Sequence, residues 1–488
     1  MSIITQQFQL IDFNNVGLFI DGTWRLKGSK GTFDVINPST KEVVASVPKG
    51  GSEEAKEAID AAERAFPVWS QLTAYDRANY LLKIRDLLLE NQEEIGTIIS
   101  LEMGKACKEA VGEVAYAASF LTWYAEEGKR IYGETIPALD ANKRLMVIKQ
   151  PAGVVAAITP WNFPIAMITR KLGPALAAGC TSIVKPASQS PLTALAFAKI
   201  VELADLPKGV VNIIVGSTNE ISNEIFESNV VRKVSFTGST AVGKDLVKSS
   251  AKTLKKLSLE LGGHAPFLIL EDADIEKAAE GAISSKFRNA GQTCVCANRI
   301  YVHKNIATQF KEAFVRKVNE LVVGESVDPT VQIGPLVSKD GLEKVKEHVK
   351  DAVEKGANIE TGGEEISDLN GYFFKPTILS NVTNEMLIMN EETFGPVAPI
   401  VEFSSIDEVI KEANDTEYGL AAYLYTTNLE NAIKVSEQLQ YGIIGLNDAL
   451  PSVAQAPFGG IKESGYGREG GHQGISDYLE EKYISLKI

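Results

Sequence analysis

The segment FRNAGQTCVC at residues 287–296 contains the side chain best suited to covalent chemistry. Cys294 follows a polar, glycine-containing stretch and precedes the apolar run RIYVH, so we expect it at the boundary of an element. Cys107 and Cys180 lack such surroundings, and we expect them to be small buried core residues. Polar neighbours of Cys294, Arg288 among them, would favour the thiolate, which is the nucleophilic form. The sequence therefore predicts a nucleophilic thiol at Cys294.

Two other side chains could assist a thiol nucleophile. Glu260 lies between leucines in LSLELGG, where it is either ion-paired or holds a raised pKa that suits a general base for water. Asn162 lies in TPWNFP, whose prolines fix the backbone, and it could aim its amide N–H at an oxyanion. No histidine is an obvious partner for Cys294, which argues against a cysteine–histidine hydrolase.

Two glycine-rich segments match nucleotide-binding motifs only in part. Residues 238–244, GSTAVGK, follow a strand-like run and match a P-loop, but Asp245 stands where Ser or Thr would bind Mg²⁺. An NTPase is therefore disfavoured, and we expect a turn at a helix N-terminus that suits a phosphate or pyrophosphate. Residues 465–470, GYGREG, match GxGxxG, yet no buried strand precedes them, and we expect a glycine-rich surface loop.

Alternating strand and helix patterns must position these side chains. The short apolar runs VVAAITP, TSIVKP, VNIIVG, KVSFTG and LSLELGG each end at Gly or Pro, with helical segments between them. This alternation predicts an α/β fold with a parallel, doubly wound sheet, which binds ligands at the carboxyl ends of its strands. A second alternating region over 264–450 predicts a second α/β lobe. Extended segments at 130–150 and at the C-terminus predict a small further sheet.

Composition limits the partners of this 488-residue chain. The formal net charge is −14, from 49 basic and 63 acidic residues, which disfavours nucleic acid and anionic membranes. The cysteines form no CxxC pair and the histidines have no metal-binding spacing, so we expect no metal site. The N-terminal segment lacks the basic start of a signal peptide, and prolines interrupt the apolar stretch 154–167. We therefore expect a soluble cytoplasmic protein.

The order of seven motifs makes the chain similar to the aldehyde dehydrogenase superfamily. The motifs are PWNFP, IVKPAS, FTGST, LELGG, GQTC, EETFGP and PFGGIKESGYGRE. Within the superfamily, MITRKLGPALAAGC, SFTGST and KFRNAGQTCVCANR most resemble the succinate-semialdehyde dehydrogenases. The resemblance implies four parts: a cofactor-binding domain over 1–128 and 148–260, a catalytic domain over 261–452, an oligomerisation element from 129–147 and 470–488, and a return segment near the active site at 453–469.

The resemblance also implies a role for each candidate residue. Cys294 would attack the aldehyde carbon, Asn162 and the backbone N–H of Cys294 would hold the oxyanion, and Glu260 would activate water to hydrolyse the thioester. The implied cofactor contacts are Trp161, Lys185, Ser188, Gly238 and Ser239 on the adenosine and pyrophosphate side, and Leu261 and Glu392 on the nicotinamide side. Ser188 stands where NAD-preferring relatives often carry Glu. We therefore expect NADP to be accepted and preferred over NAD.

The substrate implied by the resemblance is succinate semialdehyde, with another short ω-carboxy aldehyde such as glutarate semialdehyde as the alternative. Arg170, Arg288 and Ser452 match positions that clamp the distal carboxylate in the semialdehyde enzymes, although Arg170 could instead be a helix-surface cation. Cys296 is either a packed small residue or the partner of Cys294 in a reversible disulfide that switches off the nucleophile.

Two further expectations follow from the resemblance. His264 stands where close relatives usually carry Asn, and its closeness to Glu260 in the chain could alter the hydrogen bonding of the base without giving it a catalytic role. The oligomerisation element implies self-association as a homodimer or homotetramer, because unpaired strand edges favour pairing with a second copy.

Overall fold

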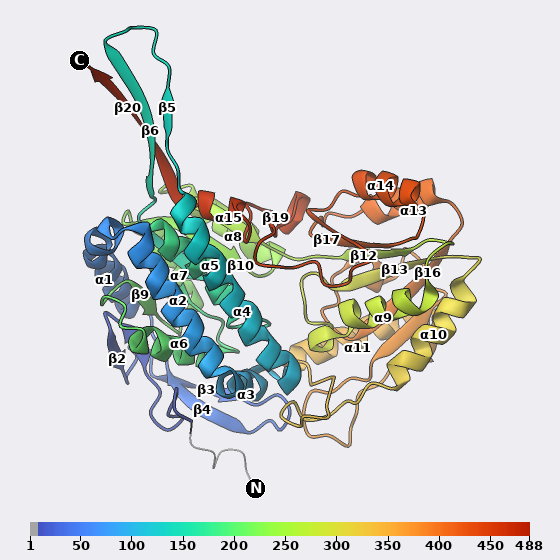
Figure 1. Cartoon of the computed structure of the whole chain (residues 1–488). Helices are drawn as coiled ribbons and strands as arrows, with labels where there is room; N and C mark the ends of the chain where they lie inside the picture. Colours follow the sequence, from blue (N-terminus) through green and yellow to red (C-terminus); the bar gives the residue numbers. More distant parts are fainter. Residues whose placement is uncertain (1–7) are drawn as a thin grey trace.

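The structure, a computed structural model, describes residues 8–488. Four sheets organise these residues into two large α/β halves and a projecting arm (Figure 1). Residues 1–7 lie outside the described residues. They contain the start of the predicted domain over 1–128 and of the segment considered as a signal peptide.

The first half is built on an eight-stranded sheet with the order β19-β11-β10-β7-β8-β9-β1-β2. The five central strands are parallel: β7 (Val154–Ile158), β8 (Thr181–Lys185), β9 (Val211–Ile213), β10 (Val231–Thr237) and β11 (Lys256–Glu260). The outer strands run antiparallel to their neighbours: β1 (Leu18–Ile20), β2 (Thr23–Arg25) and β19 (Gly465–Tyr466). The predicted parallel, doubly wound sheet is therefore confirmed.

Helices cover both faces of this sheet, because its central strands are apolar on both sides. Val155 and Ala157 belong to a core shared with the second to sixth helices, whereas Val154 and Ala156 belong to a core shared with the first and seventh. The helices of this half are α1 (Ser52–Gln71), α2 (Ala74–Glu90), α3 (Gln92–Met103), α4 (Cys107–Glu127), α5 (Ala166–Ala178), α6 (Pro191–Leu203), α7 (Thr218–Glu227) and α8 (Thr240–Ser250).

The second half repeats this plan on a seven-stranded sheet with the order β14-β15-β16-β13-β12-β17-β18. Its strands are β12 (Ala265–Ile269), β13 (Ala297–His303), β14 (Asn358–Thr361), β15 (Thr377–Ser380), β16 (Val397–Phe403), β17 (Ala421–Tyr425) and β18 (Ile443–Leu446). Its helices are α9 (Ile275–Lys286), α10 (Ala307–Asn319), α11 (Lys339–Glu354), α12 (Leu387–Asn390), α13 (Ile406–Asn414) and α14 (Leu429–Gln438). The predicted second α/β lobe is confirmed, and only its edge strand β14 is antiparallel to its neighbour.

A three-stranded sheet forms the arm, which projects from the first half and carries the C-terminus at its end (Figure 1). Its central strand β6 (Lys143–Pro151) pairs antiparallel with β5 (Glu134–Ile136) and β20 (Leu479–Lys487). These strands occupy the segments predicted to be extended. The smaller remaining elements are β3 (Thr32–Ile36) paired with β4 (Val43–Pro48), α15 (Gln473–Ser476), and the turns η2 (Gly128–Arg130), η3 (Arg288–Gly291) and η4 (Lys462–Ser464).

The glycine-rich segment 465–470, predicted as a surface loop, is partly built into the first sheet. Gly465 and Tyr466 form β19 and pair with Glu260 and Leu259 of β11. A Cβ at Gly465 would lie 1.9 Å from the carbonyl oxygen of Leu259, and the glycine has a φ of +114°. The prediction of a solvated loop is therefore wrong at this point, because the glycine allows a close approach of two backbones.

Candidate active site

The carboxyl ends of β7, β8, β10 and β11 meet at one edge of the first sheet. In the register of these strands, Ile158 lies opposite both Phe236 and Lys185, and Thr237 lies opposite Glu260. The turns that follow the strands therefore lie next to one another, as expected for a ligand site in a parallel sheet.

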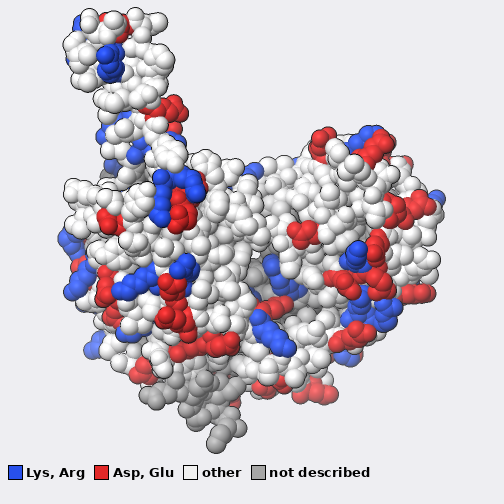
Figure 2. All heavy atoms as spheres, in the orientation of Figure 1, with Lys and Arg blue, Asp and Glu red and all other residues white. Residues whose placement is uncertain are grey.

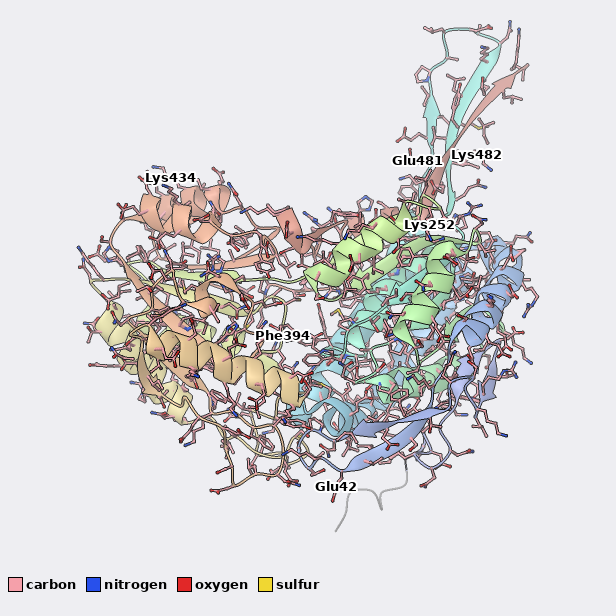
Figure 3. All side chains as sticks on the ribbon, turned by 180° about the vertical axis from the view of Figure 1, so that it is seen from behind. Glu42, Lys252, Phe394, Lys434, Glu481 and Lys482 are labelled. Carbon is pink, nitrogen blue, oxygen red and sulfur yellow. The ribbon has the colours of Figure 1, made fainter. Side chains whose placement is uncertain are left out.

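A cavity of about 250 Å³ opens at this edge. It brings together seven of the predicted site residues: Trp161, Asn162, Gly238, Ser239, Leu261, Cys294 and Glu392. Its other lining residues are Pro160, Phe163, Met167, Thr237, Gly262 and Phe394. Phe394 lies between the two halves in Figure 3, and the surface between the halves is hollowed in Figure 2. Both halves thus contribute walls to one site.

Cys294 is half-buried in the wall of this cavity. Burial raises the pKa of its thiol to about 12, and the guanidinium groups of Arg170 and Arg288 lower it by less. Arg288 thus favours the thiolate, as predicted, but the net shift has the opposite sign because lost hydration outweighs the nearby cations. Attack by this thiol therefore requires a group that can accept its proton.

Glu260 is buried at the end of β11, and neither carboxylate oxygen has a hydrogen-bond partner among residues 8–488. Burial, followed by the charge of Glu469, raises the pKa of Glu260 well above its usual range, while Arg170 and Lys171 act in the opposite direction. Of the two interpretations left by the sequence, the geometry favours a carboxyl group poised by desolvation. A raised pKa makes the carboxylate a stronger base toward the proton of a thiol or of water.

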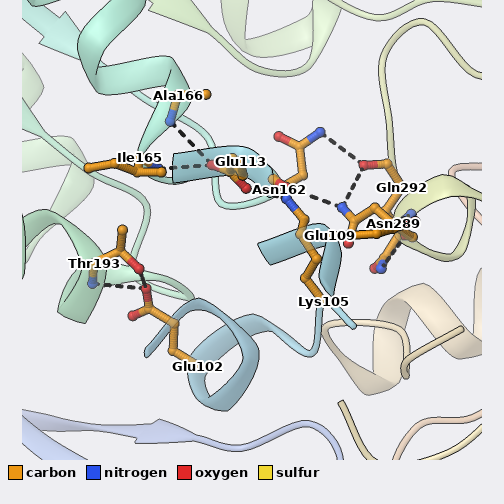
Figure 4. Close-up of polar contacts among 10 residues, drawn as sticks. All are labelled: Glu102, Lys105, Glu109, Glu113, Asn162, Ile165, Ala166, Thr193, Asn289 and Gln292. Atoms are coloured by element: carbon orange, nitrogen blue, oxygen red, sulfur yellow. Dashed lines mark hydrogen bonds and ion pairs between the residues drawn. The ribbon is translucent and has the colours of Figure 1, made fainter. Parts of the chain in front are cut away.

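Asn162 is fixed through its side chain and through its backbone (Figure 4). Its Nδ2 donates to the carbonyl oxygen of Gln292 at 3.0 Å, which orients the amide nitrogen and leaves its second N–H for a ligand. The carbonyl oxygen of Asn162 accepts from Lys105 Nζ at 2.7 Å and from Asn289 Nδ2 at 3.2 Å. The sequence did not reveal Lys105, Asn289 or Gln292 as supports, since each acts through backbone atoms of a distant segment.

Glu392 lines the cavity from the second half, where its Oε1 accepts from the backbone N–H of Gly263 at 3.1 Å. Burial raises the pKa of Glu392 to about 7. Phe394 stands close by with a left-handed backbone, at a φ of 53°, and its ring meets that of Trp161 edge-on at 5.5 Å between centroids. The EETFGP motif marked this segment in the sequence, but no local pattern singled out Phe394 as part of the wall.

The turn before α8 has the properties of an anion site. Ser239 is the N-cap of α8, and its Oγ accepts from the backbone N–H of Val242 at 3.5 Å. The free N–H groups of a first helical turn favour a phosphate placed beside them. Lys244 of the P-loop-like segment instead pairs with Glu463, 2.5 Å away. This arrangement fits a pyrophosphate better than a magnesium-bound triphosphate.

A buried cation, Lys185, is the last residue of β8, the strand next to β7. Lys185 Nζ donates to Thr218 Oγ1 at 2.8 Å, and burial lowers the pKa of this lysine to about 8. No acidic side chain among residues 8–488 forms an ion pair with Lys185. Ser188 is exposed in the turn after β8. Neither residue lines the cavity around Cys294, although β8 lies next to β7, whose turn holds Asn162. Together with the Gly238 turn, they fit a bound dinucleotide.

The three residues predicted to clamp a carboxylate are not assembled at the cavity around Cys294. Arg170 is buried, pairs with Glu469 (Nε to Oε2, 3.1 Å) and has its guanidinium 3.9 Å from the ring centroid of Phe458. Its alternative interpretation as a helix-surface cation is wrong, because the side chain is only 2% exposed. Ser452 Oγ lies 2.6 Å from the hydroxyl of Tyr116 on α4. No sequence pattern had marked Tyr116 as part of the site.

Arg288 lies between two cavities. It lines a second cavity of about 290 Å³ with Lys108 and Leu450. Its guanidinium also lies 5.1 Å from the ring centroid of Phe163, which lines the first cavity. Arg288 is therefore the clamp candidate whose charge is both accessible and near the nucleophile.

Cys296 and His264 are both buried beside the site. Cys296 Sγ lies 3.4 Å from Lys286 Nζ, and both Cys294 and Cys296 are free thiols in this structure. The Nε2 of His264 is bonded to the carbonyl oxygen of Met389 at 2.9 Å, and burial holds the pKa of His264 well below its usual range. His264 is thus neutral and links the segment after β11 to the segment that carries Glu392.

Between residues 8 and 488, no three His, Cys, Asp or Glu side chains are grouped so that they could hold a metal ion. Over the same residues, no helix combines the length and the apolar character needed to span a membrane.

Comparisons with known proteins agree with this geometry. The model of the aldehyde dehydrogenase family matches residues 24–484. The chain is 52% identical over 469 residues to the succinate-semialdehyde dehydrogenase (NADP(+)) GabD of Escherichia coli (strain K12), with 96% of this chain and 97% of that protein covered. It is 51% identical over 468 residues to a glutarate-semialdehyde dehydrogenase of Pseudomonas aeruginosa, with 96% and 97% covered. An NADP dependent enzyme of E. coli has the same fold, with a TM-score of 0.96 at 51% identity over 98% of this chain and 100% of that one.

Proposed function

Because this chain belongs to the aldehyde dehydrogenase family, we propose that it oxidises succinate semialdehyde to succinate with a nicotinamide dinucleotide. The main support for the proposal is that Cys294, Asn162, the Gly238 turn and Glu392 line the same cavity. The names of the relatives at 52% and 51% identity support the substrate class, since both specify a semialdehyde of a dicarboxylic acid.

Residues in and next to the cavity each have a distinct role in the proposed reaction. Cys294 Sγ bonds to the aldehyde carbon as its proton leaves, and the unpartnered carboxylate of Glu260 is the nearby acceptor. The second N–H of Asn162 and the backbone N–H of Cys294 stabilise the oxyanion of the adduct. A dinucleotide held by Lys185, Ser188 and the Gly238 turn would supply the acceptor for the hydride whose loss converts the Cys294 adduct into a thioester. After Glu260 has released the thiol proton to solvent, it takes a proton from water, whose oxygen attacks the thioester. The protonated Glu260 then returns this proton to the leaving sulfur of Cys294, so that succinate and the thiol are released.

Replacement of the nucleophile tests this function. Cys294→Ala removes the atom that carries the acyl group, so we expect loss of aldehyde-dependent dinucleotide reduction to the background rate while dinucleotide binding persists. The assay follows the near-ultraviolet absorbance of the reduced dinucleotide with succinate semialdehyde as the substrate. Undiminished oxidation by this variant would exclude the mechanism. Phosphate release from ATP, measured in parallel, tests the disfavoured NTPase function.

We also propose that NADP is preferred over NAD. Ser188 places no carboxylate in the turn after β8, and a carboxylate there would repel a 2′-phosphate. Lys185 is the last residue of β8 and has no acidic partner among the described residues 8–488, so its charge is available to a phosphate. The name of the E. coli relative, which includes NADP(+), supports this preference. The ratio of kcat/KM for the two dinucleotides tests it, and a strong NAD preference would refute it.

Glutarate semialdehyde is the second candidate substrate, favoured by the name of the P. aeruginosa relative. The two semialdehydes differ by one methylene group, and a pocket discriminates such a difference by only about 10- to 200-fold. Both carry a distal carboxylate, for which Arg288 and Ser452 are the proposed ligands. Parallel measurement of kcat/KM for both compounds ranks them.

Several further features stay proposals. The division into a cofactor-binding domain, a catalytic domain, an oligomerisation element and a return segment is supported by the separate sheets. Self-association through the arm is supported by its exposed strands. A reversible disulfide between Cys294 and Cys296 is supported by the presence of two free thiols two residues apart. A cytoplasmic location stays a prediction from the acidic composition.

A further inference from the structure

Two consecutive strand–turn–helix units carry the proposed ligand turns of the first half. The turn between β7 and α5 holds Asn162, and the turn between β8 and α6 begins after Lys185, the last residue of β8, and holds Ser188. Neither α5 nor α6 has a hydrogen bond from its own N-cap side chain, although the first N–H groups of a helix need acceptors. Acceptors for both helices must therefore come from elsewhere in the chain.

Glu113 of α4 supplies the acceptor for α5 (Figure 4). Its Oε1 accepts from the backbone N–H groups of Ile165 and Ala166 at 3.0 and 3.2 Å. Lys105 forms a buried ion pair with Glu113, and its Nζ donates to the carbonyl oxygen of Asn162 at 2.7 Å. The pair thus holds the chain on both sides of the turn between Asn162 and Ala166. Both side chains are only 1% exposed, so water cannot replace these contacts.

Glu102, at the end of α3, supplies the acceptor for α6 (Figure 4). Its carboxylate accepts from the backbone N–H groups of Leu192 and Thr193 at 2.6 and 2.9 Å, and from the hydroxyl of Thr193. Glu102 is 1% exposed, and burial raises its pKa to about 8. Its three hydrogen bonds favour the carboxylate form and act against that shift.

We propose that residues 102–113 position two turns of the active site independently of each other. Glu113, with Lys105, sets the turn of the oxyanion donor Asn162, whereas Glu102 sets the turn that follows Lys185 and carries Ser188. The proposal rests on the proposed function, because it takes Asn162 as an oxyanion donor and the turn after β8 as part of the dinucleotide site. All three are positioning residues, since they reach the ligands only through backbone atoms of the turns.

The physical consequence is that each turn keeps its ligand-binding side chain free. The side chain of a helix N-cap residue usually accepts a hydrogen bond from the first turn of the helix. In α5 and α6 a distant carboxylate accepts these hydrogen bonds instead. Asn162 can then use one N–H on Gln292 and keep the other for an oxyanion. A displacement of about 1 Å at such a donor can cost roughly 10²-fold in rate, so loss of the support should be visible in catalysis.

Two isosteric substitutions separate the two supports. Glu113→Gln keeps the volume and one acceptor but removes the charge. We expect roughly 10- to 100-fold lower kcat, with the Kd for NADPH within about twofold of wild type. Glu102→Gln should give the opposite split, with a Kd for NADPH raised roughly 5- to 50-fold and a kcat at saturating dinucleotide within about threefold of wild type. Glu126→Gln, an exposed position on the same helix α4, is the matched control and should change neither value.

A second readout needs no dinucleotide. p-Nitrophenyl acetate acylates a thiol through an oxyanion, so its cleavage depends on Cys294, Asn162 and the base Glu260 but not on a dinucleotide. We expect Glu113→Gln to slow this cleavage and Glu102→Gln to leave it unchanged. If Glu113→Gln does not fold, Lys105→Gln and Lys105→Arg replace it, and only the arginine variant should recover cleavage.

The outcomes distinguish this proposal from the proposed function. Equal changes of kcat, Kd and ester cleavage in both glutamine variants, or no change in either, would overturn separate positioning. Wild-type protein that cleaves the ester and binds NADPH but oxidises no semialdehyde would instead count against the substrate, and the split between the two variants could still be measured. Circular dichroism spectra and thermal unfolding of each variant exclude global loss of structure as the cause.

Discussion

Arg288 is the clamp candidate on which the substrate class can be tested at the scale of one residue. Arg170 already pairs with Glu469, whereas no ion pair of Arg288 is found among residues 8–488. A guanidinium group binds a carboxylate with two parallel hydrogen bonds, each stronger than a neutral one. Arg288→Ala should therefore raise KM for succinate semialdehyde by roughly 10- to 100-fold, because about 1.5–3 kcal/mol is lost with a charged hydrogen-bonded contact.

The control for this prediction is an aldehyde of similar length without a charge. Butanal should show a change in KM of less than about threefold in Arg288→Ala, since it has no group for the guanidinium to bind. Lys108→Ala removes a second, exposed cation of the cavity that Arg288 lines, and should affect neither aldehyde strongly. Equal effects of Arg288→Ala on both aldehydes would contradict the clamp.

Glu392 gives the site a predicted dependence on pH. Burial raises the pKa of this carboxyl group to about 7, so the group changes from neutral to charged between about pH 6 and 8. The charged form accepts hydrogen bonds from ribose hydroxyls more strongly, by about 1 kcal/mol. The Kd for NADPH should therefore fall by roughly fivefold as pH rises through this range, and Glu392→Gln should remove that contribution. Fluorescence titration at several pH values measures both, and an unchanged pH profile in the variant would exclude this assignment.

At the scale of elements, the nucleophile segment depends on close contact with the turn after β11. A Cβ at Gly263 would lie 2.1 Å from the carbonyl oxygen of Cys294, and backbone atoms cannot yield as a flexible side chain can. Gly263→Ala should displace the nucleophile and lower kcat/KM by at least roughly 10²-fold. Gly112→Ala is the matched control, because a Cβ there meets nothing within 4 Å and alanine favours the helix that contains it. Comparable activity of the two variants would show that the contact can relax.

The elements also show what the sequence could and could not predict. The strands β7, β8, β10 and β11 were predictable because each is a short apolar run closed by Gly or Pro, and parallel pairing places their ends together. The contacts of Glu469 were not, because Lys171 is 298 residues away and only the folded chain brings them together. The short strand at Gly465 escaped for the same reason, since its partner lies in β11.

The candidate site, too, could be predicted from the sequence only in part. Cys294, Asn162 and Glu260 could be identified because motif order and local polarity mark them. The raised pKa of Cys294 could not, since it comes from burial by segments of both halves. The resemblance also could not reveal that Arg170 is engaged by Glu469, which depends on the arrangement of side chains around a particular buried carboxylate.

At the scale of the whole molecule, the net charge of −14 does not conflict with an anionic substrate. Acidic and basic side chains are interspersed over both halves of the face in Figure 2. Charges on an exposed surface are screened over about 8 Å at physiological salt. The cations near the cavity, Arg288 and Lys108 among them, therefore dominate the field that a short dicarboxylic semialdehyde meets.

The arm gives a prediction about assembly, because its edges are exposed and apolar. Ile136 on β5 is 42% exposed and Leu486 on β20 is 47% exposed, and the arm stands away from the body with Glu481 and Lys482 near its base (Figure 3). Exposed strand edges of this kind favour pairing with another chain. Ile136→Asp places an unpaired charge in that interface, so we expect the molar mass measured by light scattering during gel filtration to fall toward that of a monomer. Leu429→Asp, at a 74% exposed position on α14 of the body, is the matched control and should leave the mass unchanged. An unchanged mass in both variants would place the interface elsewhere, whereas loss of mass together with retained p-nitrophenyl acetate cleavage would show that each copy builds its own site.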